Sequence, residues 1–319
     1  MIWHGVPALV FAPMDGITDA AMRMHVGSWG VFTYAVTEFI RVSQNALQAK
    51  TFRRDIPELA MACVTSTGLP VQIQLLGGDP ERMALSAMAA VAAGATMIDI
   101  NFGCPAPTVN RNDGGASLLR FPSRIEEVVR AVREATPPEV PVSAKLRLGW
   151  EEIDDIHETA SRAVNGGASW ITIHARTKKQ GYQPPVFWPK IGEVRAEVGV
   201  PVIANGDIFS IDDFQRCRDE TGCIHFMIGR GALARPKLAA MIAKELGISA
   251  EASPDPDWKS EFRGFLACER ALHGPSDKKA LLRLKQWASI AHKHGQIEGF
   301  DRAKRAATVE EFLFAIGAG

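Results

Sequence analysis

Short apolar runs alternate with longer amphipathic stretches through the first three quarters of the chain. A short apolar run bounded by turn residues predicts a buried strand, whereas apolar residues that recur at helical spacing predict a helix with one buried face. The predicted strands are residues 9–13, 34–37, 71–75, 97–100, 142–146, 170–173, 202–204 and 225–228.

The stretches between most of these strands are rich in Ala, Arg and Glu. They predict helices, for example at residues 80–93, 122–135, 154–165 and 211–220. Eight strands that alternate with helices match an α/β fold of the (β/α)8 TIM barrel type better than an open sheet, which usually has about six strands. A doubly wound open sheet is the alternative.

The pattern changes after residue 246. Residues 247–257 are polar and contain two prolines, which is typical of a linker. Beyond them, residues 258–272, 277–294 and 302–316 predict helices, and no run predicts a strand. We therefore expect a barrel domain over residues 1–246 and a small α-helical bundle domain over residues 258–319.

Composition narrows the class of protein further. No run of 18 apolar residues occurs, and the N-terminus lacks the basic region and long apolar stretch of a secretory signal. The five cysteines form no CxxC pair and are odd in number, which favours reduced thiols over a disulfide framework or a zinc site. These observations predict a cytoplasmic protein without a metal centre.

Charge is unevenly distributed, although the whole chain balances 36 basic against 36 acidic residues. Residues 258–319 contain 11 Lys and Arg against 7 Asp and Glu, an excess of four positive charges. The rest of the chain therefore has 25 basic and 29 acidic residues, so the predicted helical segment is its more basic part.

Polar residues and glycines follow the carboxyl ends of the predicted strands. In a TIM barrel these ends meet at one mouth, which carries the active site. The residues found there are Pro13 and Met14, Glu38, Gln74, Asn101 with Cys104, Lys145 with Arg147, His174 with Arg176, Asn205-Gly206-Asp207, and Gly229-Arg230-Gly231.

The last two of these strand ends suggest a phosphate site. In TIM barrels the loops after strands seven and eight commonly bind a phosphate group, because free backbone N–H groups and a following helix start favour an anion. Arg230 would add a planar charged donor. A phosphorylated cofactor across the mouth is the expected ligand.

Three further side chains offer chemistry at this mouth. Lys145 interrupts an apolar strand, where an ammonium group is costly without a partner; an electron-rich ring that gains negative charge on reduction is one such partner. Gln74 has both a donor and an acceptor, which suits the amide edge of an isoalloxazine. Cys104 lies on a loop just past a strand end, placed for chemistry, with a small buried packing residue as the alternative.

Several motifs are recognisable as a set. They are Ala12-Pro13-Met14, Thr37-Glu38-Phe39, Gln72-Ile73-Gln74-Leu75-Leu76-Gly77, Asn101-Phe102-Gly103-Cys104-Pro105, Lys145-Leu146-Arg147, His174-Ala175-Arg176-Thr177, Asn205-Gly206-Asp207 and Met227-Ile228-Gly229-Arg230-Gly231. In this combination the chain resembles the tRNA-dihydrouridine synthases, from the first strand into the C-terminal helices.

The resemblance implies an FMN enzyme that reduces the C5–C6 double bond of uridine in the D-loop of tRNA to 5,6-dihydrouridine, with NADPH as electron donor. It implies that Cys104 is the proton donor, and that Asn101, Arg147 and His174 surround the target uracil. The residues implied at the cofactor are Ala12, Pro13, Met14, Gln74, Lys145, His174, Asn205, Gly206, Asp207, Gly229 and Arg230.

Within the family, residues 37–41 and 283–287 are most similar to the subgroup that acts on uridine 16. The resemblance implies tRNA contacts at Arg41, Arg283 and Lys285, and we expect a further contact at Lys304. Two positions depart from the pattern. Pro107 stands where many relatives carry Lys. Lys304 stands near a position where the subgroup has Arg, so the positive charge is kept but the bidentate geometry of a guanidinium is lost.

The implied reaction agrees with the residue types. After hydride has added to C6 of the uracil, the enolate must be protonated at C5, and a thiol with an ordinary pKa of about 8.5 still holds its proton near neutrality. Lys145 or His174 could stabilise the negative oxygen of the enolate. The stacked base must be flipped out to reach the mouth, while the basic helical segment binds the phosphate backbone.

Two other functions stay open at this point. A barrel flavoprotein that acts on free pyrimidines would leave the basic helical segment unexplained. A tRNA-binding protein without catalysis would be colourless when purified. For the favoured function we expect a monomer with tRNA and NADPH as partners, and neither a metal nor a membrane.

Overall fold

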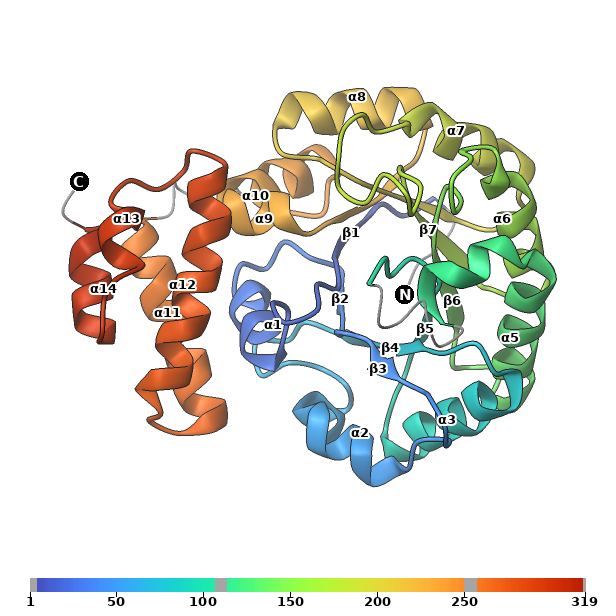
Figure 1. Ribbon diagram of the computed structural model, residues 1–319, viewed down its shortest axis with the longest axis horizontal. Coiled ribbons are helices and arrows are strands. Elements are labelled where there is room, and N and C mark those ends of the chain that lie inside the picture. The colour runs from blue at the N-terminus through green and yellow to red at the C-terminus, as the bar shows by residue number, and fades with distance from the viewer. Residues whose placement is uncertain (1–4, 107–113, 250–256, 318–319) are drawn as a thin grey trace.

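The structure, a computed structural model, describes residues 5–106, 114–249 and 257–317. Its first three quarters form a closed barrel of parallel strands with helices around the outside (Figure 1). β1 pairs with β2 and β9, and β2 pairs with β4, which closes the ring. The barrel strands are β1 (Ala8–Phe11), β2 (Tyr34–Val36), β4 (Val71–Leu76), β5 (Ile98–Asn101), β6 (Val142–Arg147), β7 (Trp170–His174), β8 (Val202–Asn205) and β9 (His225–Ile228).

Closure confirms the predicted TIM barrel and rules out the doubly wound sheet, which would leave two open edges. Each of the eight predicted strands is present, with small differences at the ends. β1 ends before Pro13, because proline has no N–H for a strand ladder. The sequence did not predict β3 (Ile40–Arg41), a two-residue strand that pairs with the carboxyl end of β4.

Helices cover the outer face of the barrel. The predictions at residues 80–93 and 122–135 are confirmed as α3 (Pro80–Ala93) and α5 (Pro122–Ala135), each of which starts at a proline. Those at 154–165 and 211–220 are confirmed as α6 (Asp155–Asn165) and α8 (Ile211–Thr221). Among the described residues before 247, the other helical segments are α1 (Ala20–Gly27), α2 (Ala49–Asp55), η1 (Pro57–Met61), η2 (Gly115–Arg120), α7 (Trp188–Glu197), α9 (Arg230–Ala234) and α10 (Pro236–Glu245).

The two faces of the barrel wall differ in polarity. On β4, Ile73 and Leu75 pack outward in the main hydrophobic core. On the same strand, Gln72 donates to Ser143 of β6 across the barrel interior, and Gln74 donates to Asp99 of the neighbouring β5. Because successive side chains of a strand point to opposite faces, these glutamines point into the barrel.

The barrel interior also has an apolar part. A separate apolar cluster includes Tyr34 and Trp170, which begin β2 and β7, with ring centroids 6.4 Å apart. The polar interior side chains therefore lie above an apolar floor, toward the carboxyl ends of the strands.

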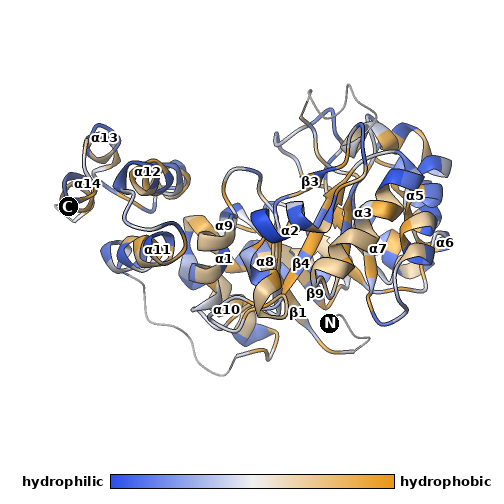
Figure 2. Ribbon diagram, turned by 90° about the horizontal axis from the view of Figure 1, so that it is seen from below, coloured by the Kyte–Doolittle hydropathy of each residue, from blue (hydrophilic) through white to orange (hydrophobic). Residues whose placement is uncertain are grey.

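Within the described residues 257–317, four helices gather beside α1 and α9 (Figures 1 and 2). They are α11 (Trp258–His273), α12 (Asp277–Lys293), α13 (Phe300–Ala303) and α14 (Val309–Ile316). The helices predicted at 258–272 and 277–294 are confirmed. The prediction of one helix over 302–316 is wrong, because extended Thr308 caps a new helix by accepting the N–H of Glu311. Residues 250–256 of the predicted linker lie outside the described residues.

Aromatic and polar contacts join these helices to the barrel. Trp287 is 1% exposed, and its indole N–H donates to the carbonyl oxygen of Leu233 at 2.8 Å. Glu261 of α11 lies 2.8 Å from Nε2 of His25 and accepts a hydrogen bond from Trp29 at 3.2 Å. The indole of Trp287 therefore packs in the core between the helical segment and the barrel.

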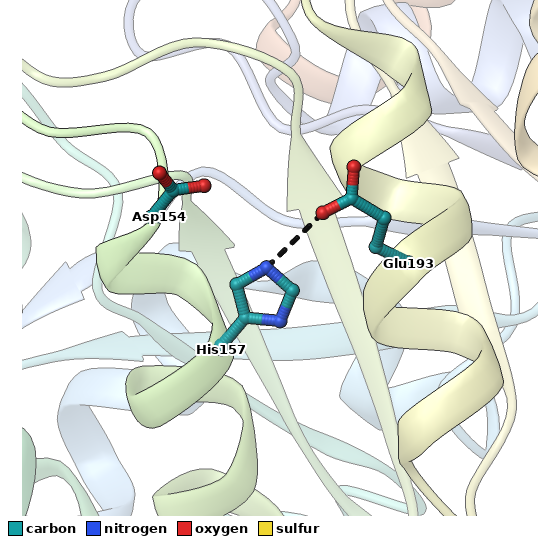
Figure 3. A group of neighbouring side chains, drawn as sticks. All are labelled: Asp154, His157 and Glu193. Carbon is teal, nitrogen blue, oxygen red and sulfur yellow. Dashed lines mark ion pairs between the residues drawn. The ribbon is translucent and has the colours of Figure 1, made fainter.

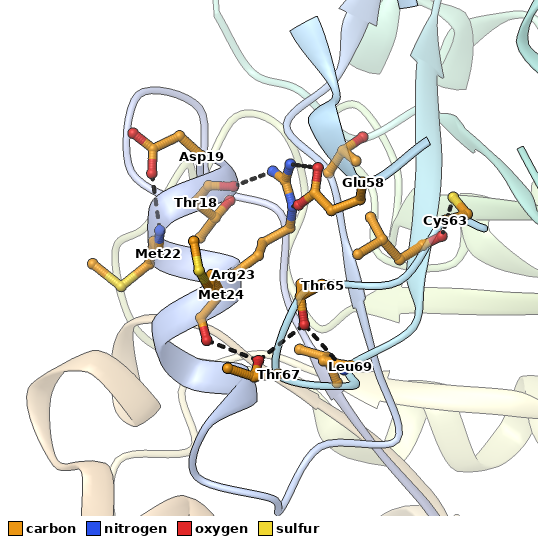
Figure 4. A network of polar contacts seen from close by, with 12 residues as sticks. Thr18, Asp19, Met22, Arg23, Met24, Glu58, Cys63, Thr65, Thr67 and Leu69 are labelled. Carbon is orange, nitrogen blue, oxygen red and sulfur yellow. Dashed lines mark hydrogen bonds and ion pairs between the residues drawn. The ribbon is translucent and has the colours of Figure 1, made fainter. Parts of the chain in front are cut away.

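The helix α1, on which α11 docks, is itself anchored to the barrel (Figure 4). Arg23 is 2% exposed and forms two bonds with the carboxylate of Glu58, at 2.8 and 3.0 Å. Its third bond goes to the carbonyl oxygen of Thr18 at 2.7 Å. With donors and acceptors matched, this buried ion pair holds α1 in one position.

Among the described residues, no helix has the length and apolar character needed to cross a membrane.

Candidate active site

A cavity of about 370 Å³ opens at the carboxyl ends of the strands. Its wall contains the predicted proton donor, every residue predicted at the cofactor and all three residues predicted around the uracil, of which His174 was predicted for both sets. These residues are Cys104; Ala12, Pro13, Met14, Gln74, Lys145, His174, Asn205, Gly206, Asp207, Gly229 and Arg230; and Asn101 and Arg147. The structure thus brings them together, while their roles stay predictions.

A buried chain of hydrogen bonds, which we call the amide relay, joins Asp99, Gln74 and Asn101. Asp99 Oδ2 accepts from Gln74 Nε2 at 2.7 Å, and Gln74 Oε1 accepts from Asn101 Nδ2 at 2.8 Å. Asn101 Oδ1 then accepts the backbone N–H groups of Gly103 and Cys104, both at 2.9 Å. The relay therefore connects the barrel interior with the loop that carries Cys104.

The carboxylate at the inner end gives the relay its direction. An ionised carboxylate only accepts hydrogen bonds, so Gln74 must turn its NH2 group toward Asp99 and its oxygen toward Asn101. Burial raises the pKa of Asp99 to about 6, against the lowering effect of hydrogen bonds from Ser143 and Gln74. Asp99 is therefore mostly ionised at neutral pH, and the oxygen of Asn101 is left to hold the Cys104 loop.

The thiol of Cys104 is half-buried in this loop. Burial raises its pKa above the ordinary value and nearby Asp15 acts in the same direction, while the N–H of Ala106 and the charge of Arg147 lower it. The net direction is upward. The thiol therefore keeps its proton at neutral pH and can act as a general acid.

Two basic side chains lie deeper in the wall. Lys145 Nζ donates to Asn205 Oδ1 at 3.0 Å, and burial together with the charge of Arg147 lowers the pKa of Lys145 to about 8. Burial, Arg147 and Lys145 also lower the pKa of His174 well below its ordinary value, so this ring is neutral. His174 Nδ1 is buried without a hydrogen-bond partner in the part of the chain that the structure describes. Such an atom points to a polar partner that would enter the cavity.

The predicted phosphate corner lies between the loops after β8 and β9. Arg230 Nη2 donates to Asp207 Oδ1 at 2.8 Å, and fully buried Arg176 bonds the other oxygen of the same carboxylate. The side chain of Asp207 therefore positions Arg230. Gly231 is required for close packing here, because a Cβ on it would lie 2.0 Å from the carbonyl oxygen of Ile208.

Arg147 links two loops of the mouth. It is 3% exposed, and its guanidinium donates to the carbonyl oxygens of Gly103 at 2.8 Å, Thr177 at 3.0 Å and Gly181 at 2.8 Å. These bonds fix the Cys104 loop against the loop after β7. Arg147 thus has a structural task beside the predicted contact with the uracil.

The predicted tRNA contacts lie apart from the cavity wall. Arg41 belongs to β3 and is partly buried, while Lys304 is exposed and pairs with Asp301. Lys285 Nζ donates to the carbonyl oxygen of Ala306 at 2.6 Å. Their roles stay predictions.

Arg283 was also predicted to contact tRNA, but the structure turns its guanidinium toward the barrel. It is 8% exposed, donates to Asp19 Oδ2 at 3.1 Å, and also donates to the carbonyl oxygens of Gly16 and Ile17. Its observed task is therefore to join α12 to the barrel.

Sequence reasoning missed Asp99 and Ser143, which support the site from within the barrel. Ser143 donates to Asp99 Oδ1 at 2.5 Å and accepts from Gln72 at 3.0 Å. A signal for them exists, because polar residues alternate with apolar ones in residues 71–75, 98–101 and 142–147. A closed barrel covered by helices can place that polar face only toward its interior.

A group of metal-ligating side chains lies on the outer surface, at Asp154, His157 and Glu193 (Figure 3). Lys190 Nζ already lies 2.7 Å from both Asp154 and Glu193. His157 forms ion pairs with Glu193 at 3.3 Å and with Glu197 at 2.8 Å. The ammonium group of Lys190 takes the place a cation would need, so this group supports no metal site.

Comparison with known proteins gives the same picture as the geometry. The profile of the dihydrouridine synthase (Dus) family matches residues 10–291. A tRNA-dihydrouridine(16) synthase from Shewanella oneidensis is 42% identical over 286 residues, which cover 89% of each chain. A tRNA-dihydrouridine(16) synthase from Aquipseudomonas alcaligenes is 42% identical over 284 residues, covering 88% of this chain and 89% of that protein.

Solved structures agree at the level of the fold. Histamine dehydrogenase from Rhizobium sp. 4-9 superposes with a TM-score of 0.55 at 14% identity, over 82% of this chain and 49% of that one. At this identity the likeness extends to the barrel alone. The family profile spans most of the chain, and the relatives match nearly their full lengths. The chain therefore belongs to the dihydrouridine synthase family.

Proposed function

We propose that this enzyme reduces the C5–C6 double bond of uridine 16 in the D-loop of tRNA to 5,6-dihydrouridine, with FMN as cofactor and NADPH as electron donor. The observation that carries the proposal is the position of Cys104 in a cavity wall that also contains Lys145, Arg147 and Arg230, on a loop whose backbone is held by the amide relay. The similar proteins from Shewanella and Aquipseudomonas support position 16.

The cavity residues fit a flavin mononucleotide. His174 offers a buried ring nitrogen that lacks a partner within the described residues, and Lys145 and Arg230 offer positive charge. Arg230 would hold the phosphate beside Gly206 and Gly229, and Lys145 and Gln74 would hold the ring, with Ala12, Pro13 and Met14 along it. A bound flavin supplies the hydride.

Cys104 delivers the proton to C5 of the uracil. Its raised pKa keeps the proton on Sγ at neutral pH, and the two N–H bonds from its loop to Asn101 keep the loop in place. Arg147 and His174 lie in the same wall, where they can donate hydrogen bonds to uracil oxygens or stabilise charge on them.

The nucleotide must leave its stack to enter this cavity. We assign catalysis to residues 1–246 and tRNA binding chiefly to residues 258–319, whose excess of four positive charges favours a polyanion. Lys285, Lys304 and, on the barrel, Arg41 are the proposed contacts. Arg283 supports them by holding α12 on the barrel.

The test is to map dihydrouridine in tRNA from a strain that lacks this protein. Loss of the modification at position 16 alone, with recovery on addition of purified enzyme, FMN and NADPH, is the expected result. Intact dihydrouridine at position 16 would contradict the proposal. Turnover of free uracil without any effect of tRNA would instead favour a flavoprotein for free pyrimidines.

A further inference from the structure

Four exposed or half-buried side chains form a continuous cluster on the rim of the barrel. We call it the rim cluster, and it consists of Arg120, Phe121, Trp150 and Lys178. The guanidinium carbon of Arg120 lies 4.3 Å from the centre of the Trp150 ring and 5.6 Å from that of Phe121. Lys178 Nζ lies 4.1 Å from the centre of the Trp150 ring. The indole of Trp150 thus holds two cations, and the ring of Phe121, which is 55% exposed, extends the cluster.

The two cations of the rim cluster lack acidic partners among the described residues. This is unusual for the surface around them, where Lys179 pairs with Glu151 at 3.0 Å and Arg124 pairs with Glu127 at 2.9 Å. Two positive charges without carboxylate partners thus lie together on one ring despite their mutual repulsion. The favourable partner for such a surface is an anion.

The rim cluster shares the face of the barrel on which the cavity opens. Trp150 follows β6, Lys178 follows β7, and Arg120 ends η2 in the segment after β5. Backbone bonds from Lys178 to Gly149 at 2.8 Å and from Lys179 to Trp150 at 2.9 Å join the two loops. The rim cluster is therefore fixed relative to the cavity.

One loop connects the rim cluster to the cavity wall. The loop after β7 carries Lys178 and, four residues later, Tyr182, which lines the cavity and is 55% exposed. The ring centre of Tyr182 lies 4.8 Å from the guanidinium carbon of Arg230 and 5.4 Å from that of Arg147. Cationic and aromatic groups thus run from the cavity to the rim.

We propose that the rim cluster binds the RNA substrate outside the cavity, with Arg120 and Lys178 on backbone phosphates and the exposed ring of Phe121 against an unstacked base. Unpaired loop nucleotides combine these two features, phosphate charge and an exposed planar face. The inference rests on the proposed function and adds to it a second RNA-binding surface, on the barrel itself. Contact with the Trp150 ring already restricts the side chains of Arg120 and Lys178, so these side chains lose less conformational entropy when RNA binds.

The experiment measures tRNA affinity over a salt series for the variant Arg120→Gln/Lys178→Gln. Loss of two phosphate contacts should reduce the slope of log affinity against log salt by roughly 1.5 and weaken binding on the order of tenfold at low salt. The matched control is Arg124→Gln/Lys179→Gln, which removes the same charge from cations that are paired with carboxylates. Its slope should stay close to that of the wild type.

A second pair of variants tests the role of the Trp150 ring in holding the two cations. Trp150→Leu should weaken tRNA binding with a smaller change in slope, and Trp150→Phe should restore it, since a ring is kept. Flavin content and nicotinamide oxidation should be unchanged in all rim variants, because those properties belong to the cavity.

The rim inference is overturned if Arg120→Gln/Lys178→Gln binds tRNA with the affinity and slope of its matched control. Equal weakening in both double variants would also overturn it, because long-range charge alone would then explain the effect. Failure of the proposed function has a different signature, since the wild type would then bind tRNA without reducing its uridine. Binding of an acidic protein or an anionic vesicle in place of tRNA would contradict the assignment to RNA.

Discussion

Arg283 provides the sharpest test of how the helical segment works. Its sequence context predicts an RNA contact, yet its guanidinium is 8% exposed and bonds Asp19 Oδ2 at 3.1 Å. It also donates to the carbonyl oxygens of Gly16 and Ile17 in the loop after β1. Truncation in Arg283→Ala would therefore leave a carboxylate and two carbonyl groups without their buried donor.

The size of the effect follows from these contacts. Removal of one partner from a buried, hydrogen-bonded ion pair typically costs about 3–5 kcal/mol. A surface arginine costs far less, about 0–1 kcal/mol, because its charge is solvated. We expect Arg283→Ala to lower the free energy of unfolding by about 3 kcal/mol or more. Arg283→Lys should recover only part of this stability, because an ammonium group keeps the charge but lacks the several N–H donors of the planar guanidinium.

The assay is urea unfolding followed by intrinsic fluorescence, which includes Trp287 and Trp29 at the interface, and in parallel by far-ultraviolet circular dichroism. The fluorescence midpoint should move to lower urea in Arg283→Ala. Arg305→Ala is the control, because this arginine lies exposed in the same helical segment. Unchanged unfolding of Arg283→Ala, combined with a reduced salt dependence of tRNA binding, would refute the interface role and restore the RNA contact.

Three further outcomes are expected in the cavity. Cys104→Ala should keep its flavin and its oxidation of NADPH, but reduce uridine roughly a hundredfold to ten-thousandfold more slowly; wild-type turnover would exclude Cys104 as the acid. Arg230→Ala should lose most of its FMN, measured by absorbance after gel filtration, because a charge-assisted bond worth about 1.5–3 kcal/mol is removed; full occupancy would contradict this placement of the phosphate. Lys145, with a pKa of about 8, loses its proton as the pH rises through that value, so the rate of flavin reduction by NADPH should decline there. In Lys145→Arg this decline should disappear. If the rate of the wild-type enzyme does not change up to about pH 9, the charge of Lys145 has no such role.

The sequence was sufficient for the barrel but not for the supports inside it. Residues 80–93 and 122–135 were predicted with the ends that the structure has, since a proline starts each helix and the apolar spacing is regular. The residues of the cavity wall were found because strand ends in a barrel converge. Which partner each side chain takes depends on contacts between strands far apart in sequence, such as Gln74 with Asp99, and no local pattern specifies them.

Arg283 shows the same limit in the helical segment. A basic residue on an amphipathic helix has the same local pattern whether it faces RNA or a buried carboxylate. The partner, Asp19, is 264 residues away in the sequence, and only the docking of α12 on the barrel brings the two together. The break at Thr308 was missed for a simpler reason, because a threonine in an amphipathic stretch can either continue a helix or cap the next one.

The amide relay has a consequence for how this active site can change over evolution or by design. Asp99, Gln74 and Asn101 share one hydrogen-bond polarity, so a reversal at any member forces the others to reverse, and the last reversal would turn an NH2 group against the N–H groups of the Cys104 loop. Gln74→Glu would likewise set two acceptors face to face. Substitutions at these three positions should therefore be strongly epistatic. The three residues can change only together, because the Asp99 carboxylate inside the barrel sets the direction of every hydrogen bond in the relay.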